Sequence, residues 1–386
     1  MKSNKIRLGE QCVVTSSKRF HLSERITQGV PFYCSKEIIK KFNGEDVTEC
    51  DYISEDLYKK VSNEFGVPKE NDLLITTRGT IGIPYLYKRT DRFYFADGNL
   101  TWIKDFDSNL YSKFLYYWFQ SYEGRKKFEA LAKGTAQKAV PISGIKTLEI
   151  ELPSLKSQKR IADILSAYDD LIENNQKQIK LLEEAAQRLY KEWFVDLRFP
   201  GHENTEIVDG VPEGWIKEEI GKIIKKVHRT KQIVASEYKD EGSIPIVDQS
   251  RAFVAGYTND LEARVDFGIP IIVFGDHTRI VKLIQFPFAK GADGTQLIIS
   301  DCLEMPQRLL YCSIMNVDLS NYHYARHFKY LKEEKIMIPT VKVANEFENN
   351  VTGIFSKIQN CRDEIIRCQK TRDLLLLKLM SGEVEV

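Results

Sequence analysis

The amino-acid sequence predicts an α+β protein whose two globular blocks are separated by two long helices that form an antiparallel coiled coil, with a pseudo-twofold internal repeat. Three observations predict this fold. Two stretches carry apolar residues at alternating spacings of three and four, each follows a globular stretch of similar length, and short motifs recur in the same order in both globular stretches. We expect four parts: block one (1–153), the central long helix (154–199), block two (200–340) and the C-terminal long helix (341–386).

Block one contains short apolar runs interrupted by Gly, Asp and Asn, which is typical of short strands joined by turns. A more continuous apolar stretch near Leu110 to Leu131 predicts a helix. The block closes on the strand-like run Ile150-Glu151-Leu152, which Pro153 ends because proline has no N–H for a strand ladder. We therefore expect a compact α+β domain.

The central helix is predicted to begin after the N-cap Ser154 and to end at Pro200-Gly201. Its apolar positions fall on one heptad seam, and only Asn175 interrupts that seam. A single buried Asn in such a seam fixes register and partner number at some cost in stability. The seam is Ile161, Leu165, Tyr168, Ile172, Asn175, Ile179, Leu182, Ala186, Leu189 and Trp193.

Block two repeats the motifs of block one in the same order. The matching pairs are run 6–10 with run 215–221, run 73–80 with run 271–278, run 96–99 with run 292–295, and run 150–153 with run 336–339. Repetition of this kind indicates two copies of one structural unit. We expect a second α+β domain of the same type.

The C-terminal helix follows Pro339-Thr340 and carries a second seam, interrupted only by Arg372. An apolar stripe must meet a partner to leave water, and the partner nearest in the chain is the central helix. Pairing between two chains is the alternative, because heptads alone do not identify the partner. The seam is Val351, Ile354, Ile358, Cys361, Ile365, Cys368, Arg372, Leu375 and Leu379.

Composition limits the class of protein. The net charge is +1, with 24 Lys and Arg against 20 Asp and Glu in block one and 17 against 20 in block two, so overall charge does not indicate nucleic-acid binding. No apolar signal core follows Met1, and we expect a cytoplasmic protein. Seven cysteines without a C-x-x-C pair are expected to be reduced and buried.

A search for catalytic motifs predicts a non-catalytic protein with no cofactor. The sequence contains neither a P-loop nor a G-x-G-x-x-G run, and no proline precedes an aspartate as in many nucleases. His323 and His327 have the i, i+4 spacing of a metal-binding pair, but no Glu follows His323 as in H-E-x-x-H. We expect no metal site, and a metal-dependent hydrolase remains an alternative.

Polar and basic clusters occupy matching positions in the two blocks, where Gly-flanked Thr, Gln and Arg could approach a DNA groove. Ordinary polar turns are the alternative interpretation of each cluster. The candidate DNA-binding residues are Thr77, Arg78, Thr80, Lys88, Arg89, Lys133, Thr135, Gln137 and Lys138 in block one, and His277, Thr278, Arg279, Lys290, Arg326 and Lys329 in block two.

The order block, helix, block, helix resembles the specificity subunits of type I restriction-modification systems. The run Leu152 to Leu165 is similar to the family's L-P-x-L-x-E-Q-K-R-I-A-x-I-L segment, with Ser157 in place of its Glu. Runs 189–196, 211–215 and 133–137 also resemble family segments. The C-terminal helix matches only by position and pattern.

The resemblance implies a function. Each block would read one half of a split double-stranded DNA site, and the paired helices would set the unread gap. The same helices would bind modification (methyltransferase) subunits, two of them, and ATP-dependent restriction subunits would join the complex. A coiled-coil adaptor that does not contact DNA is a further alternative.

Overall fold

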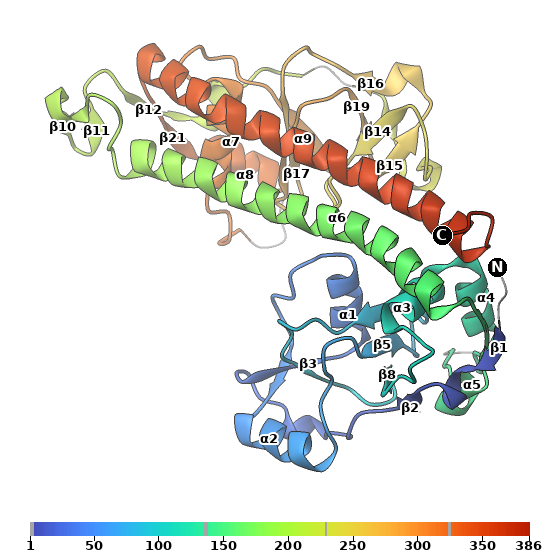
Figure 1. The fold of residues 1–386 in the computed structure, drawn as a ribbon. Coiled ribbons are helices and arrows are strands. Elements are labelled where there is room, and N and C mark those ends of the chain that lie inside the picture. Colours follow the sequence, from blue (N-terminus) through green and yellow to red (C-terminus); the bar gives the residue numbers. More distant parts are fainter. Residues whose placement is uncertain (1–3, 135–137, 228–229, 323–325) are drawn as a thin grey trace. The chain divides into compact units, whose positions relative to one another are not determined.

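The computed structural model describes residues 4–134, 138–227, 230–322 and 326–386, and the chain divides into two compact units (Figure 1). Unit 1 comprises residues 1–176 and 363–386, and unit 2 comprises residues 177–362. Each unit therefore contains one globular block together with one part of each long helix.

Block one is built on two small sheets. One is antiparallel with strand order β2-β8-β5-β6, and the other has order β4-β3-β7 with β3 and β7 parallel. Tyr33 from one sheet shares a buried apolar cluster with Leu74 and Trp102 from the other, so the two sheets pack against each other through these side chains. The strands are β2 (Val13–Thr15), β3 (Val30–Tyr33), β4 (Asp51–Ile53), β5 (Leu73–Thr76), β6 (Pro84–Leu86), β7 (Tyr94–Phe95) and β8 (Leu100–Lys104).

Helices surround these sheets, and a two-stranded ladder of β1 (Asn4–Arg7) and β9 (Glu149–Leu152) closes the block. The predicted helical stretch near Leu110 to Leu131 is confirmed as two helices, α3 (Ser112–Gln120) and α4 (Tyr122–Ala130). Ser121 separates them, because its hydroxyl caps α4 by accepting from the Gly124 N–H at 3.1 Å. The remaining helices are α1 (Ser35–Phe42), α2 (Glu55–Glu64) and α5 (Ile142–Lys146).

Block two repeats most of this topology. Its central antiparallel sheet is β18-β17-β20, and β14 pairs with β15 antiparallel and with β19 parallel, while β12 and β21 close the block. These are the counterparts of β6-β5-β8, β4-β3-β7 and β1-β9, so the predicted internal repeat is confirmed. The elements are β12 (Ile216–Glu219), β14 (Ile244–Val247), β15 (Gly256–Thr258), β17 (Ile271–Gly275), β18 (Val281–Ile284), β19 (Phe288–Gly291), β20 (Thr295–Ile298), α7 (Gln307–Met315), α8 (His327–Glu333) and β21 (Lys335–Ile338).

Short elements extend this plan. β13 (Gln232–Ile233) and β16 (Arg264–Val265) each pair with β19, and β10 (Ile207–Val208) with β11 (Val211–Pro212) forms a small hairpin at the start of block two, ahead of β12. A single 3-10 turn follows the opening strand of each block, at Leu8–Glu10 and at Ile220–Lys222. The opening of block two therefore copies the opening of block one.

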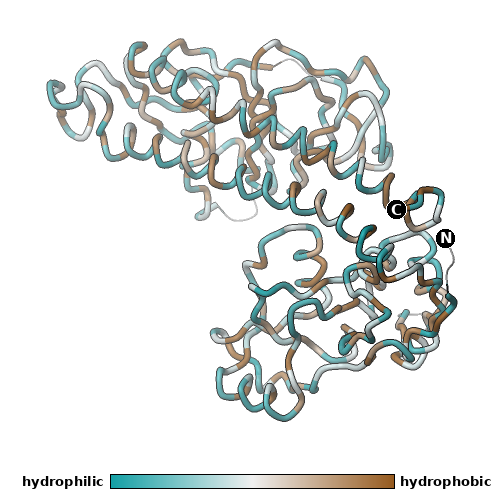
Figure 2. The backbone as a smooth tube through the Cα atoms, viewed as in Figure 1, coloured by the Kyte–Doolittle hydropathy of each residue, from teal (hydrophilic) through white to brown (hydrophobic). Residues whose placement is uncertain are grey.

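The two long helices are α6 (Leu155–Tyr190), which continues into the π-helical turn Lys191–Val195, and α9 (Val341–Met380). The hydroxyl of Ser154 accepts from the Ser157 N–H at 3.2 Å, as expected of an N-cap. Brown apolar turns alternate with teal polar turns along both helices (Figure 2). No helix of the described ranges is both long enough and apolar enough to cross a membrane.

The helices pair in antiparallel orientation within each unit. In unit 1 Asp169 contacts Arg372, and Ser157, nearer the start of α6, contacts Val386 beyond the end of α9. In unit 2 Glu183 contacts Arg362, whereas the later residue Tyr190 meets the earlier residue Phe347. In each unit, later residues of α6 therefore contact earlier residues of α9, as antiparallel helices do.

Each unit buries its own part of the seam. In unit 1 Ile161 and Leu165 share a core cluster with Leu376 and Leu379, and in unit 2 Ala186 and Tyr190 share one with Phe347 and Val351. The predicted pairing residues that are buried are Ile161, Leu165, Ile172, Val351 and Ile358; those that are half-buried are Tyr168, Ile179, Leu182, Ile354, Ile365 and Leu375. The seam therefore faces protein rather than solvent.

Candidate DNA interface

Three segments of block one meet where β5 ends. The backbone N–H of Thr77 donates to the Asn99 carbonyl at 2.9 Å, and the Thr77 carbonyl accepts from the Val140 N–H at 2.9 Å. Thr77 therefore joins the loop after β5 to the Asp97-Gly98 turn and to the segment before α5. We call the described residues 77–80, 96–99, 133–134 and 138–140 loop site one.

Block two builds the same junction at the end of β17. The Asp276 N–H donates to the Gly294 carbonyl at 2.7 Å, and the Asp276 carbonyl accepts from the His327 N–H at 2.9 Å. The Asp276 carboxylate also accepts from the Phe328 N–H at 2.8 Å, in the first turn of α8. We call residues 276–279, 292–295 and 326–329 loop site two.

The glycine of each Ala-Asp-Gly turn has a backbone conformation that favours glycine. Gly98 has a φ of +70° and Gly294 a φ of +82°. A Cβ on Gly294 would lie 2.7 Å from the Gln249 Nε2 and 2.7 Å from the His277 Cδ2. The glycine in block two thus lets the turn pack closely against the loop after β17.

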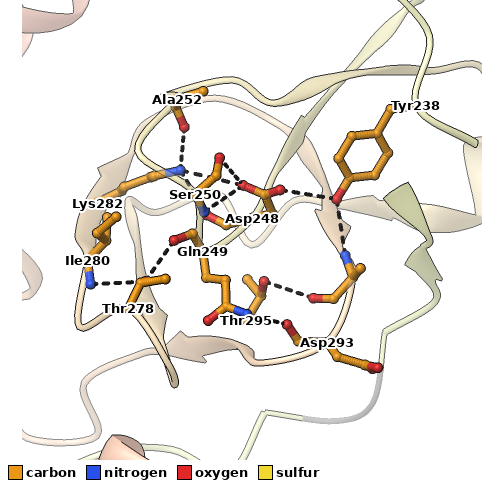
Figure 3. A network of polar contacts seen from close by, with 11 residues as sticks. Tyr238, Asp248, Gln249, Ser250, Ala252, Thr278, Ile280, Lys282, Asp293 and Thr295 are labelled. Atoms are coloured by element: carbon orange, nitrogen blue, oxygen red, sulfur yellow. Dashed lines mark hydrogen bonds and ion pairs between the residues drawn. The ribbon is translucent and has the colours of Figure 1, made fainter. Parts of the chain in front are cut away.

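Gln249 ties the loops of site two together (Figure 3). Its side-chain Nε2 donates to the Asp293 carbonyl at 2.8 Å. Its Oε1 accepts from the His277 N–H at 3.1 Å. Its backbone carbonyl accepts from the Thr278 hydroxyl at 2.7 Å. The imidazole of His277 is consequently presented at the surface from a loop whose backbone is held in place.

A buried ammonium group holds the segment that carries Gln249 by hydrogen bonds to its backbone carbonyls. Lys282 on β18 is 4% exposed, and its Nζ donates to the carbonyls of Asp248 at 2.8 Å and Ala252 at 2.5 Å (Figure 3). Burial lowers the pKa of Lys282 to about 8, and the nearby Asp248 carboxylate opposes that shift. The Tyr238 hydroxyl donates to the same carboxylate at 3.3 Å.

Most of the predicted DNA-contacting side chains are exposed. The exposed ones are Arg78, Thr80, Lys88, Arg89, Lys133 and Lys138 in block one, and His277, Thr278, Arg279, Arg326 and Lys329 in block two. Thr135 and Gln137 lie outside the described residues. Apart from Lys88 and Arg89, these exposed residues belong to the two loop sites, so each block brings its candidates together.

Four candidates are placed differently from the rest. Thr77 is 3% exposed, so its side chain is not part of the candidate surface. Lys290 is half-buried on β19, and burial lowers its pKa. Lys88 forms an ion pair with Glu173 of α6 at 2.5 Å, and the neighbouring Arg89 lies with it between β6 and β7, outside loop site one.

Arg279 combines exposure with an internal contact. Its Nη1 donates to the Leu319 carbonyl at 3.0 Å, and its φ of +61° is unusual for a residue other than glycine. The guanidinium therefore braces the loop after β17 against the segment that follows α7. This positive-φ position lies within loop site two.

The histidine pair does not form a described metal site. His323 lies outside the described residues, and His327 is 6% exposed with its Nδ1 buried and without a hydrogen-bond partner. Burial is the main cause that lowers the pKa of His327, followed by the charge of Arg279. The described residues hold no group of three or more His, Cys, Asp or Glu able to bind a metal ion.

Gln158, the glutamine of the motif at the start of the central helix, has a structural role. It is 1% exposed, its Oε1 accepts from the Tyr111 N–H at 2.9 Å, and its Nε2 donates to the carbonyls of Asn109 at 2.9 Å and Pro153 at 3.0 Å. All polar atoms of this side chain are engaged where block one meets α6. A hydrophobicity pattern gives no signal for such a residue.

Comparison with known proteins now decides the family. Residues 3–184 match the model of the type I restriction modification DNA specificity domain. The chain is 30% identical over 303 residues to the type I restriction enzyme MjaIX specificity subunit of Methanocaldococcus jannaschii, an alignment that covers 71% of this chain and 69% of that protein. The chain belongs to the family of type I restriction enzyme specificity subunits.

Further similarities agree with this family. A putative type I restriction enzyme specificity subunit of Haemophilus influenzae is 28% identical over 187 residues, covering 48% of this chain and 45% of that protein. The crystal structure of the type I restriction-modification system S subunit from M. genitalium aligns with a TM-score of 0.62 and 18% identity, over 98% of this chain and 96% of that chain. The fold of this specificity subunit is therefore shared along nearly its whole length.

Proposed function

We propose that this specificity subunit reads a split DNA site, with loop site one facing one half-site and loop site two facing the other. The observation that carries the proposal is the repeated junction at Thr77 and Asp276, where the same two backbone hydrogen bonds join three segments in each block. Two similar reading surfaces on dissimilar sequences suit an asymmetric bipartite sequence.

The chemistry of the loop sites supports contact with DNA. Arg78 in block one and His277 in block two are exposed, and both lie on the loop that follows the central strand of their block. Arg can form two hydrogen bonds to a guanine edge, and the imidazole of His can donate or accept. Lys133, Lys138, Arg326 and Lys329 supply positive charge beside them for phosphate contacts.

The remaining parts have complementary roles in this proposal. Block one (1–153) and block two (200–340) are the reading domains, and the helical regions 154–199 and 341–386 set the unread gap and bind two methyltransferase subunits. Restriction subunits join that complex and use ATP. The specificity subunit itself has no catalytic activity or cofactor and works on DNA in the cytoplasm.

Deletion of the gene tests this function in a host that expresses the whole system. Motif-level methylation sequencing should show that one split motif loses methylation in the deleted strain and regains it on complementation. An unchanged methylation pattern would exclude a DNA-reading role. Purified complex should also bind DNA with a steep dependence on salt, which an adaptor without DNA contacts would lack.

A further inference from the structure

A carboxylate on α6 is shared by block one and by α9 in unit 1. Asp169 Oδ2 accepts from the hydroxyl of Tyr117 on α3 at 2.6 Å, and Asp169 Oδ1 accepts from Arg372 Nη1 at 2.6 Å. Tyr117 is 3% exposed. Both oxygens of Asp169 are therefore used to join three elements: α3 of block one, α6 and α9.

These contacts select one orientation more sharply than apolar packing does. Arg372 and Asp169 have side chains that are 23% and 29% exposed, and Arg372 Nη2 also donates to Asp373 at 2.8 Å. Hydrogen bonds to charged groups are short, directional and stronger than neutral ones. A small rotation of α3 on α6 would break the Tyr117 bond, whereas apolar side chains could repack.

Block one touches the same side of α6 at two further points. Lys88 contacts Glu173, one turn beyond Asp169, and a Cβ on Gly44 would lie 2.8 Å from the Gln176 Oε1. Gly44 has a φ of +75° and thereby lets the end of α1 approach α6 closely. Asp169, Glu173 and Gln176 follow one another at spacings of four and three, which places them along one face of the helix.

Unit 2 contains an analogous arrangement made from different residues. Glu348 on α9 accepts from Arg308 Nη1 on α7 at 2.8 Å and from the Leu309 N–H at 3.3 Å. Arg362 on α9 pairs with Glu183 on α6 at 2.8 Å. Since α7 is the counterpart of α3, each block is held by a carboxylate on the long helix that follows it.

We propose that Asp169, together with Tyr117 and Arg372, fixes the orientation of block one on the helix pair and thereby fixes the number of unread base pairs that the complex accepts between the two half-sites. This inference rests on the proposed function. One extra base pair moves a half-site by about 3.4 Å and turns it by roughly a tenth of a helical turn. Only a block held in one orientation can reject such a change.

The test uses the full-length chain assembled with its methyltransferase subunits. Methyl transfer is measured on DNA in which both half-sites are constant and the gap is the natural length, one base pair shorter or one base pair longer. We expect D169N and Y117F to raise methylation of the altered gaps, relative to the natural gap, by at least about five-fold, which corresponds to roughly 1 kcal/mol. The bases read in each half-site should not change.

Asp170→Asn is the matched control, because Asp170 is the exposed neighbour on α6 and the substitution removes the same charge. It should keep the gap preference of the unaltered protein. Y117F removes a single hydroxyl, so it remains informative even if D169N does not assemble. The inference is overturned if assembled Y117F complex keeps the original gap preference, or if it alters the half-site bases instead.

Failure of the proposed function would look different. If the unaltered complex methylates no split site, the reading role itself is wrong. If it methylates one split site and the variants retain its gap preference, only the role assigned to Asp169 is wrong.

Discussion

At the scale of single residues, Lys282 is a charged group that the fold buries almost completely. Its ammonium lies within block two and supports the segment that carries Gln249. Its pKa falls to about 8 through burial, whereas a solvated lysine titrates near 10.5. Between these pH values the unfolded chain holds a proton that the folded chain has released, so the contribution of Lys282 to stability rises with pH.

This shift gives a pH-dependent prediction for Lys282→Met. Below pH 8 the folded protein bears the full cost of burying a charge, and that cost is relieved as pH rises toward 10. The free energy of unfolding of the unaltered protein should therefore increase relative to K282M by about 2 kcal/mol between pH 7 and pH 10. Denaturant unfolding of both proteins at each pH measures this difference, and a pH-independent difference would contradict it.

Arg78 gives a prediction about DNA affinity. Arg78→Ala should weaken binding of the assembled complex to its site by about ten-fold, because one groove or phosphate contact is worth about 1–3 kcal/mol. Lys60→Ala on α2 removes an exposed positive charge outside loop site one and is the matched control. Fluorescence anisotropy at fixed salt measures the DNA affinity of both variants. Equal losses of affinity would show that Arg78 contributes only its positive charge and makes no specific contact.

Sequence reasoning located the loop sites but not the residues that hold them. The repeated Ala-Asp-Gly turns and the runs after β5 and β17 could be identified because chemically similar residues recur in the same order in both blocks. Gln249 and Lys282 were missed, since their partners are mostly backbone groups brought close only by folding. Thr77 was selected for its side chain, although its backbone makes the junction and its side chain is buried.

At the scale of elements, the helix seams were predictable and their polar contacts were not. Alternating spacings of three and four identify an apolar stripe directly. Arg372 stood out only as an interruption of the stripe, and its partner Asp169 lies beside the seam residue Tyr168. Which carboxylate meets which arginine depends on helix register, and a hydrophobic pattern sets that register only to within a heptad.

Asn175 gives a prediction about the helix pair. It is 3% exposed in the seam, and its Nδ2 donates to the Leu171 carbonyl of its own helix at 3.0 Å. Asn175→Leu should raise the free energy of unfolding by about 1 kcal/mol, because a buried amide is replaced by an apolar side chain of similar size. It should also increase self-association, since the buried Asn restricts the number of partners.

The neighbouring Asn174 provides the control, because it is exposed on the same helix. Asn174→Leu should leave the free energy of unfolding within about 0.5 kcal/mol of the unaltered value, as most surface substitutions do. Chemical denaturation and sedimentation velocity separate stability from self-association. Destabilisation by N175L alone would show that the amide makes a net favourable contribution in the seam.

At the scale of the whole molecule, the chain has two globular blocks of similar strand order, and we propose that their different loops recognise different bases. The repeat was predictable from the sequence because the motifs occur in the same order in both blocks, although many of their residues differ. The sequence does not give the DNA target, because base recognition depends on where Arg78, His277 and their neighbours lie in a groove. We therefore propose that the two loop sites determine specificity, and the bases that they read have to be measured.

The most direct test is methylation-motif sequencing of DNA from hosts that carry the complete system with Arg78→Ala or with His277→Ala in this chain. The account predicts that the first variant relaxes the bases of one half of the split motif and that the second relaxes only the other half. If both variants, once shown to assemble, altered the same half or left the motif unchanged, the assignment of one half-site to each block would be contradicted.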